Sequence, residues 1–308
     1  MKASKENRLT RKFSPLSAIM LAILILFTIV LLGMLFWAVM TAFKSASFSG
    51  FKSKTPSTYK LPKELHFENI DKVMASFFLE GVAYPESVGG TRTVYIGHMF
   101  IYTILYCVGC SVIQTIVQCV TAYLCAKFNY KLSKVVEYIV IIVMTIPIVG
   151  SLPAEITLSK KLGLYNHMYG IWIMKANFLG MYFLIFLAAF KGISMTYTEA
   201  AKIDGASNMC IMLKIIFPLV KNVIFTVILV NFITYWKDYQ TPLIYINAYP
   251  TVTYGLFRII FDSSSSAGMV SVPIRMTASI IVVMPLIVIF IIFQKRLLGN
   301  LTMGGIKG

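Results

Sequence analysis

The sequence predicts an all-α integral membrane protein with six transmembrane helices, one N-terminal span followed by a five-span core. The chain has 308 residues, of which 58% are hydrophobic and only 13% charged. A soluble domain is about 45–50% apolar and about 25% charged, so lipid is the natural solvent for this chain. Six apolar stretches approach or exceed the ~17–25 residues that cross a hydrocarbon core. Their backbones must satisfy their own hydrogen bonds in lipid, which requires helices.

The first predicted span covers residues 16–43 and follows a basic tail at residues 1–15. The tail carries five basic residues against Glu6 alone. The apolar run is longer than the ~7–15-residue hydrophobic region of a secretory signal peptide. We therefore interpret it as a retained span. The alternative is a signal peptide cleaved near Ala46.

A long polar segment, residues 44–96, is expected to be an extracytoplasmic loop. Within it, apolar residues recur at helical spacing and predict a short amphipathic helix resting on the bilayer or on a partner; these residues are Phe67, Ile70, Val73, Met74 and Phe77. The core then occupies residues 97–293. Its five spans are expected at 97–126, 136–157, 170–190, 219–236 and 276–293, before a cytoplasmic tail at 294–308.

The distribution of charge predicts that both termini are cytoplasmic. With that orientation, the cytoplasmic segments hold fifteen of the 28 basic residues but only four of the 12 acidic ones. An excess of Lys and Arg in cytoplasmic loops is the usual membrane pattern. The net charge of +16 could suggest nucleic-acid binding, but the charge is spread among the connections between apolar stretches and forms no single basic face.

No catalytic residues and no metal site are predicted. Cys107 and Cys110 form a C-x-x-C pair inside an apolar stretch, where small buried residues are the simpler explanation. The three histidines are scattered, without metal-ligand spacing. The chain has no phosphate-binding G-x-x-x-x-G-K-[ST] loop, no G-x-S-x-G and no H-E-x-x-H sequence.

The segment 198–219, between the fourth and fifth spans, predicts two short surface helices around a glycine. Thr198 is a candidate N-cap, Glu199 suits a first helical turn, and Gly205 permits a bend, or a close approach where a side chain would obstruct. A second helix is expected to end at Pro218. Its apolar stripe is expected to be exposed, which suggests docking onto a partner, and consists of Met209, Met212, Leu213 and Ile216.

This segment resembles the EAA loop of binding-protein-dependent importer permeases, a Glu-Ala-Ala followed by a glycine four residues on and an apolar-x-Pro end. Here these are Glu199, Ala200, Ala201, Gly205 and Phe217-Pro218, and the form at 199–206 is similar to the sugar branch. Residues 236–244 and the tail from Gln294 also resemble sugar permeases similar to MalG. The departures are Lys237, where Asn is usual, and Lys221-Asn222, where many relatives have a second proline.

The resemblance implies the permease subunit of an ATP-driven importer with a type I core, which translocates a sugar delivered by an extracellular binding protein, with an oligosaccharide as the expected size. It implies a second, MalF-like permease and two ATPase subunits that hold ATP and Mg²⁺, so no cofactor binds this chain. The implied ATPase-coupling residues are Glu199, Ala200, Ala201, Asp204, Gly205, Met209, Met212, Leu213 and Pro218. The implied tail contacts are Gly304, Gly305, Lys307 and Gly308.

Polar and aromatic groups inside the predicted spans are candidates for the solute pathway. An ionisable group within a membrane span is a functional candidate by default, because its burial in lipid is costly. They are Asn231, Tyr235, Trp236 and Lys175. Each has a simpler alternative: Asn231 could bond a neighbouring helix, Lys175 could snorkel to the interface, and the two aromatic residues could belong to an interfacial belt. Rival functions are an importer of a non-sugar solute, an ion-coupled secondary transporter and a membrane-embedded enzyme.

Overall fold

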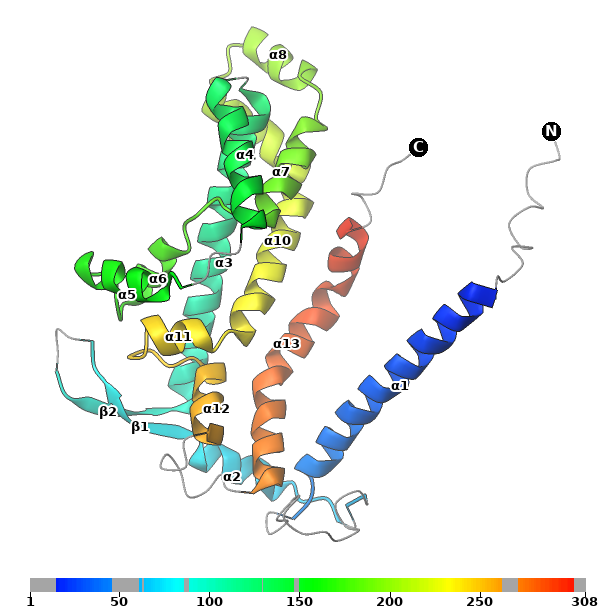
Figure 1. The fold of residues 1–308 in the computed structure, drawn as a ribbon, viewed down its shortest axis with the longest axis vertical. Helices are drawn as coiled ribbons and strands as arrows, with labels where there is room; N and C mark the ends of the chain where they lie inside the picture. The colour runs from blue at the N-terminus through cyan, green and yellow to red at the C-terminus, as the bar shows by residue number, and fades with distance from the viewer. Residues whose placement is uncertain are drawn as a thin grey trace. The chain divides into compact units, whose positions relative to one another are not determined.

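The computed structural model is all-α apart from one hairpin, and it describes residues 15–45, 61–62, 64–85, 89–128, 130–146, 150–261 and 271–301. In this part of the chain, four helices are long and apolar enough to cross a membrane. They belong to α1 (Pro15–Ala42), α3 (Ile96–Lys127), the run Asn208–Lys237 and α13 (Val272–Leu301) (Figure 1). A fifth is possible if two helices bent by 66° form one span. The all-α membrane fold is thus confirmed, with four or five such helices among the described residues.

The chain forms two compact units. The first comprises Met1–Val73 and Gly268–Ile280. Its helix α1 is apolar all round and exposed from Leu16 to Phe36, as expected for a helix surrounded by lipid or by other apolar helices. The last carbonyls of α1 lack intrahelical partners. Asn69 Nδ2 donates to the carbonyls of Ala42 and Lys44 at 2.8 Å, and Thr277 Oγ1 donates to Ala42 at 3.0 Å.

The short amphipathic helix predicted in the polar segment is confirmed as α2 (Glu68–Ser76). Of its apolar stripe, Val73 and Phe77 are buried, whereas Ile70 and Met74 are exposed. A hairpin that the sequence analysis missed follows it, with β1 (Phe78–Ala83) antiparallel to β2 (Thr91–Tyr95). The segment at 44–96 therefore contains regular structure as well as loop.

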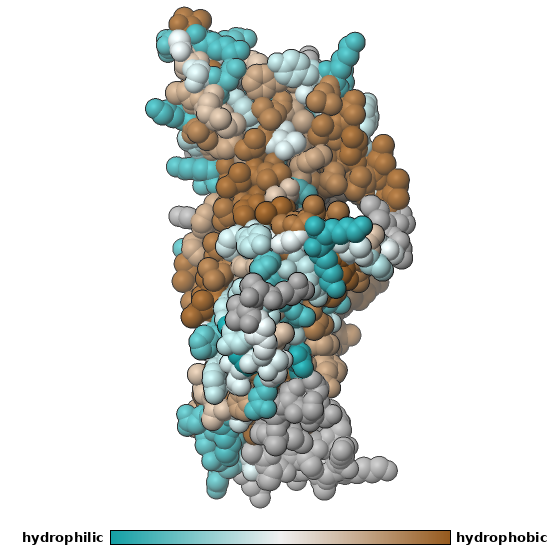
Figure 2. Space-filling view, turned by 90° about the vertical axis from the view of Figure 1, so that its left-hand side faces the viewer, coloured by the Kyte–Doolittle hydropathy of each residue, from teal (hydrophilic) through white to brown (hydrophobic). Residues whose placement is uncertain are grey.

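The second unit comprises Met74–Ala267 and Ile281–Gly308. Its centre is α3, which packs against α7 (Met181–Lys191) and α10 (Phe217–Lys237). The remaining helices are α4 (Lys131–Thr145), α5 (Leu152–Lys161), α6 (Met168–Met174), α8 (Thr196–Ile203), α9 (Asn208–Cys210), α11 (Gln240–Tyr245) and α12 (Val252–Phe261), with a π-helix η3 at Ile211–Ile216. Apolar side chains dominate large areas of the surface in Figure 2, as a lipid-facing protein requires.

Two predicted spans are corrected by the structure, because each is broken. The stretch 136–157 is divided between α4 and α5, and Gly150 between them has φ +89°. Pro153 lies in the first turn of α5, where its missing N–H removes no bond. The stretch 170–190 is divided between α6 and α7, with Gly180 at φ +143°. Only glycine adopts these conformations readily, and each glycine lies just before the second helix of its pair, so one continuous helix does not pass through either position.

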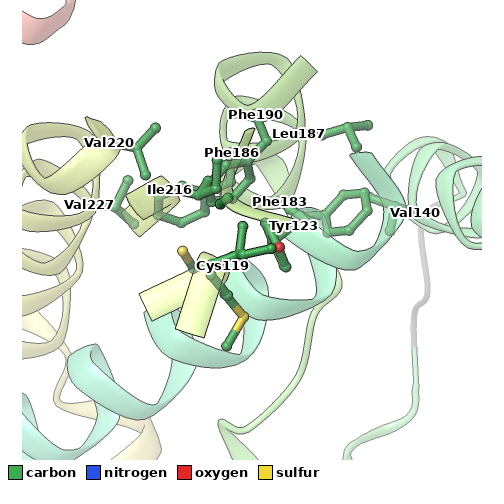
Figure 3. Packing of buried hydrophobic residues seen from close by; sticks show 14 residues of the cluster. Cys119, Tyr123, Val140, Phe183, Phe186, Leu187, Phe190, Ile216, Val220 and Val227 are labelled. Carbon is green, nitrogen blue, oxygen red and sulfur yellow. The ribbon is translucent and has the colours of Figure 1, made fainter. Parts of the chain in front are cut away.

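The main apolar core of the second unit lies where α3, α4, α7 and α10 meet (Figure 3). Tyr123 of α3 contacts the rings of Phe190 and Phe217 edge-on, with centroids 5.6 and 6.0 Å apart. Phe190 and Phe217 stack on each other at 6.1 Å. Edge-on and offset aromatic pairs are favourable beyond the area they bury. This core gives the segment that follows α7 a rigid base.

Candidate functional site

The predicted loop begins at a sharp bend between α7 and α8. The two helices differ in direction by 66°, and α8 extends beyond the ends of α4 and α7 in Figure 1. Met195 is the N-cap, and its carbonyl accepts from the amides of Thr198 and Glu199 at 2.9 and 3.0 Å. The expectation that Thr198 caps this helix is therefore wrong. Thr198 lies inside α8, and its buried Oγ1 has no hydrogen-bond partner among the residues that the structure describes.

One side of α8 is fixed to the core and the other is exposed. Thr198 and Ala201, three residues apart, are buried, and Ala201 belongs to the cluster drawn in Figure 3. Glu199, Ala200 and Asp204 are exposed. Residues three apart share a helix face, so α8 presents its Glu199–Ala200 side away from the protein.

Gly205 ends α8 in a Schellman motif. Its φ is +77°, its amide donates to the Lys202 carbonyl at 3.1 Å, and the Ala206 amide donates to the Ala201 carbonyl at 2.9 Å. These two bonds satisfy orphan carbonyls at a helix C-terminus and require a left-handed residue between them. The predicted bend at Gly205 is confirmed. Apart from its two chain neighbours, no described residue has an atom within 4 Å of the place a Cβ would take, so the need for glycine here is conformational.

The second predicted helix does not end at Pro218, which is a correction. Residues 208–237 form one continuous helical run, which begins where the Ser207 side chain accepts from the Cys210 amide. The π-helix η3 precedes the proline, and the Phe217 amide donates to Met212, five residues back. Pro218 then lies in the first turn of α10. A π-turn shifts the hydrogen-bond register, which is how the run continues past a residue without an N–H.

The apolar stripe is divided, so the prediction of one exposed face is wrong. Met212 and Ile216 are buried in the core, whereas Met209 and Leu213 are 62% and 52% exposed. Met212 supports the loop from within, and the exposed apolar surface of the predicted stripe is narrower than expected.

The sequence did not predict a further exposed apolar residue, Ile203, which is 86% exposed at the end of α8. The sequence carries no periodic signal for it, because Ile203 is a single apolar residue directly before Asp204-Gly205 at a helix end.

A shallow hollow of about 580 Å³ lies beside the exposed face of α8. Its walls come from α8, from the bend and from η3, and the lining residues are Ser194, Thr196, Tyr197, Ala200, Ala201, Asp204 and Ile215. Tyr197 is 53% exposed. The site is therefore an exposed, partly apolar helix end beside a hollow, a shape suited to receive another protein surface.

The four pathway candidates mostly have partners within the protein. Asn231 Nδ2 donates to Thr115 Oγ1 at 3.1 Å, and Trp236 Nε1 donates to the Val282 carbonyl at 3.1 Å. Tyr235 OH donates to Gln114 Oε1, and Lys175 Nζ lies 5.7 Å from the Tyr235 ring centroid. Asn231, Tyr235 and Trp236 are buried. These contacts favour helix packing as the role of the three buried residues. For Asn231 this is the simpler of the two alternatives that the sequence left open.

A substitution at Asn231 separates packing from a pathway role. We expect Asn231→Leu to lower stability by about 0.5–1.5 kcal/mol, because interhelical hydrogen bonds in membranes contribute that much. Thermal unfolding of the purified complex measures this. Uptake by the molecules that remain folded should be unchanged. A variant with wild-type stability and lost uptake would instead place Asn231 in the pathway.

Other predicted features lie partly beyond the described residues. The tail contacts at Gly304, Gly305, Lys307 and Gly308, like most of the basic tail at 1–15, fall outside them. Within the described ranges, no group of three or more His, Cys, Asp or Glu side chains could hold a metal ion. Cys107 and Cys110 are buried, as expected for small residues of a packed helix, whereas Cys125 at the end of α3 is only partly buried.

Comparisons with known proteins agree with this architecture. The melibiose/raffinose/stachyose import permease protein MelC of Bacillus subtilis is 25% identical over 69% of this chain and 77% of its own length. The maltodextrin transport system permease protein MalD of Streptococcus pneumoniae is 24% identical over 98% of both chains. A solved bacterial ABC transporter involved in the import of the acidic polysaccharide alginate shares the fold, with a TM-score of 0.71, 20% identity and coverage of 93% and 98%.

The family match includes the segment around Gly205 and the helices on both sides of it. The sequence model of the binding-protein-dependent transport system inner membrane component covers residues 118–301, well over half of the chain. This range contains α7, the bend, α8, Gly205 and the helical run that follows. The chain therefore belongs to the family of binding-protein-dependent transport system inner membrane components.

Proposed function

We propose that this chain is the permease subunit of an ATP-driven importer that translocates a sugar, with an oligosaccharide as the expected size. The observation that carries the proposal is the loop at 198–219, where a Glu-Ala-Ala helix ends in a Schellman motif at Gly205 and stands exposed at the end of the helical core. Relatives named for maltodextrin, raffinose and galactooligosaccharide transport support the sugar class.

The partners in this proposal are a second, MalF-like permease, two ATP-binding cassette subunits and an extracellular sugar-binding protein. ATP and Mg²⁺ bind the cassette subunits, and this chain contributes no covalent chemistry. Both termini and the loop lie in the cytoplasm, because the basic residues gather in those segments. The exposed apolar surface of α1 is consistent with lipid or a second permease around it.

The exposed face of α8 and the start of the next helix form the surface that meets the ATPase. Ile203, Met209 and Leu213 supply its apolar contacts, and Glu199 and Asp204 its charges. Ala200 keeps the face flat, Gly205 sets its direction, and Ala201 and Met212 hold it against the core. Pro218 lies in the first turn of α10, where the helical run leaves this surface. The tail, Gly304 to Gly308, is proposed as a second contact with the ATPases.

Uptake into vesicles tests the proposed function. The permease is reconstituted with the second permease, the ATPase and the binding protein, and a panel of neutral oligosaccharides is supplied outside. We expect uptake that requires ATP and the binding protein, persists with a protonophore, and raises ATP hydrolysis severalfold. Uptake of peptides or phosphodiesters only would favour the non-sugar alternative. Uptake driven by an ion gradient without ATP would instead indicate a secondary transporter.

A further inference from the structure

Two lysines lie where the ends of α3 and α7 meet the bend before α8. Lys127, the last residue of α3, donates from Nζ to the Ile193 carbonyl at 2.6 Å and lies 3.9 Å from the Met195 sulfur. Lys191, the last residue of α7, donates from Nζ to both carboxylate oxygens of Glu137 on α4, each at 2.9 Å. Ile193 and Met195 belong to the four-residue break between α7 and α8.

Lys127 meets an electrostatic need at this place. The last carbonyls of a helix have no intrahelical partner and carry a partial negative charge. The bond from Lys127 to Ile193 brings its ammonium group from the end of α3 to the end of α7. A cation near a helix C-terminus is stabilising, and here it also joins two elements 66 residues apart in sequence.

The Lys127 contact differs from the Lys191 pair in what it holds. The Lys191–Glu137 ion pair joins two helices, and its side chains are 51% and 24% exposed. Exposed pairs of this kind contribute little to stability. The Lys127 bond is partly buried and is made to the backbone of the bend itself, two residues before the N-cap of α8. It therefore restrains the direction in which α8 leaves α7.

We propose that Lys127 is a positioning residue for transmission between the ATPase and the membrane helices, because its bond to the Ile193 carbonyl fixes the α7–α8 bend. This inference rests on the proposed function of α8 as the ATPase contact. A loop that moves freely about the bend would absorb the motion of the ATPase. A bend held to the end of α3 passes that motion to the centre of the helical core, where α3 contacts α7 and α10.

The test compares Lys127→Met, which removes the donor and keeps the length, with Lys127→Arg, which keeps a cationic donor. Lys191→Met is the matched control, because it removes a nearby lysine that does not bond the bend. Each is studied in the assembled complex. Loss of a hydrogen bond from a charged group shifts an equilibrium constant roughly tenfold, here the one between the bend held by Lys127 and the bend released from it. We therefore expect Lys127→Met to lower solute transported per ATP hydrolysed by about tenfold, with normal membrane abundance.

The geometry is measured separately from activity. Spin labels at Leu124→Cys on α3 and Lys202→Cys on α8, with Cys125 and Cys210 replaced by serine, report the distance across the bend; Leu124 and Lys202 are exposed. We expect the distance distribution to widen in Lys127→Met and to stay narrow in Lys127→Arg and Lys191→Met. This distance measurement tests the Lys127 bond directly, without relying on transport or ATP hydrolysis.

Each outcome decides between the proposal and a simpler role. A widened distribution together with reduced transport per ATP supports it, as does recovery of both in Lys127→Arg. An unchanged distance distribution in Lys127→Met would overturn the proposal. Uptake and ATP hydrolysis that both fall in proportion to a lower membrane abundance would also overturn it, because that result indicates a role in folding alone. A widened distribution with intact coupling would also overturn it. If a disrupted Gly205 leaves coupling intact as well, the proposed function of α8 fails too.

Discussion

Replacing Gly205 with valine is expected to leave the chain in the membrane and to abolish solute-stimulated ATP hydrolysis. Gly205 has φ +77° and closes the Schellman motif at the end of α8. A side chain with a Cβ costs about 1–2 kcal/mol in this conformation, and a β-branched one is a genuine outlier. The valine variant should therefore abandon the motif and turn the exposed end of α8 away from the proposed ATPase contact. Stimulated hydrolysis in the reconstituted complex measures the effect.

Two controls identify the cause. Gly205→Asn should retain most of the stimulation, because Asn tolerates the left-handed region and no described residue beyond the two chain neighbours has an atom within 4 Å of the new Cβ. Gly192→Ala, at a φ of −72° in the same region of the chain, should have little effect. Loss of stimulation in the Asn variant as complete as in the valine variant would contradict the backbone explanation. Full stimulation by Gly205→Val at normal abundance would contradict transmission through this loop.

The long helices and the glycine bend were predictable because their causes are local. The apolar runs of α1, α3, α10 and α13 exceed the length that lipid demands, so composition alone predicts them. Gly205 follows a helix pattern at the place where a C-terminal glycine is expected. By contrast, the breaks at Gly150 and Gly180 depend on backbone conformation, which an average over apolar residues does not detect. Two spans were consequently predicted as unbroken.

The candidate site shows a second limit of periodicity. Spacing indicates that Met209, Met212, Leu213 and Ile216 recur along a helix, but it does not indicate what covers them. In the fold, Met212 and Ile216 belong to the same buried apolar cluster as Phe190, whereas Met209 and Leu213 are exposed. Ile203 was missed because one apolar residue among polar ones has no period. Its importance follows only from its exposure in the fold.

Replacing Ile203 with aspartate is expected to release the ATPase from a complex whose permease remains folded. Ile203 is 86% exposed, so the change removes little contact inside this chain. At the proposed interface, burial of an isoleucine side chain contributes about 1.5–3 kcal/mol, and a buried unpaired carboxylate adds a further penalty. The ATPase should bind more than tenfold more weakly. Leu162→Asp, at a residue 61% exposed in another part of the unit, is the control and should bind normally.

The most direct measurement is cross-linking from Ile203→Cys to the ATPase in intact membranes, in a chain with Cys125 and Cys210 replaced by serine. A short thiol cross-linker is applied with a single introduced cysteine on the ATPase surface, and the adduct is detected by gel. We expect one adduct that contains both subunits, that depends on position 203, and whose yield changes when ATP and solute are added. An adduct from Leu162→Cys at equal yield, or none from position 203 with the complex intact, would contradict the assignment of this loop as the ATPase contact.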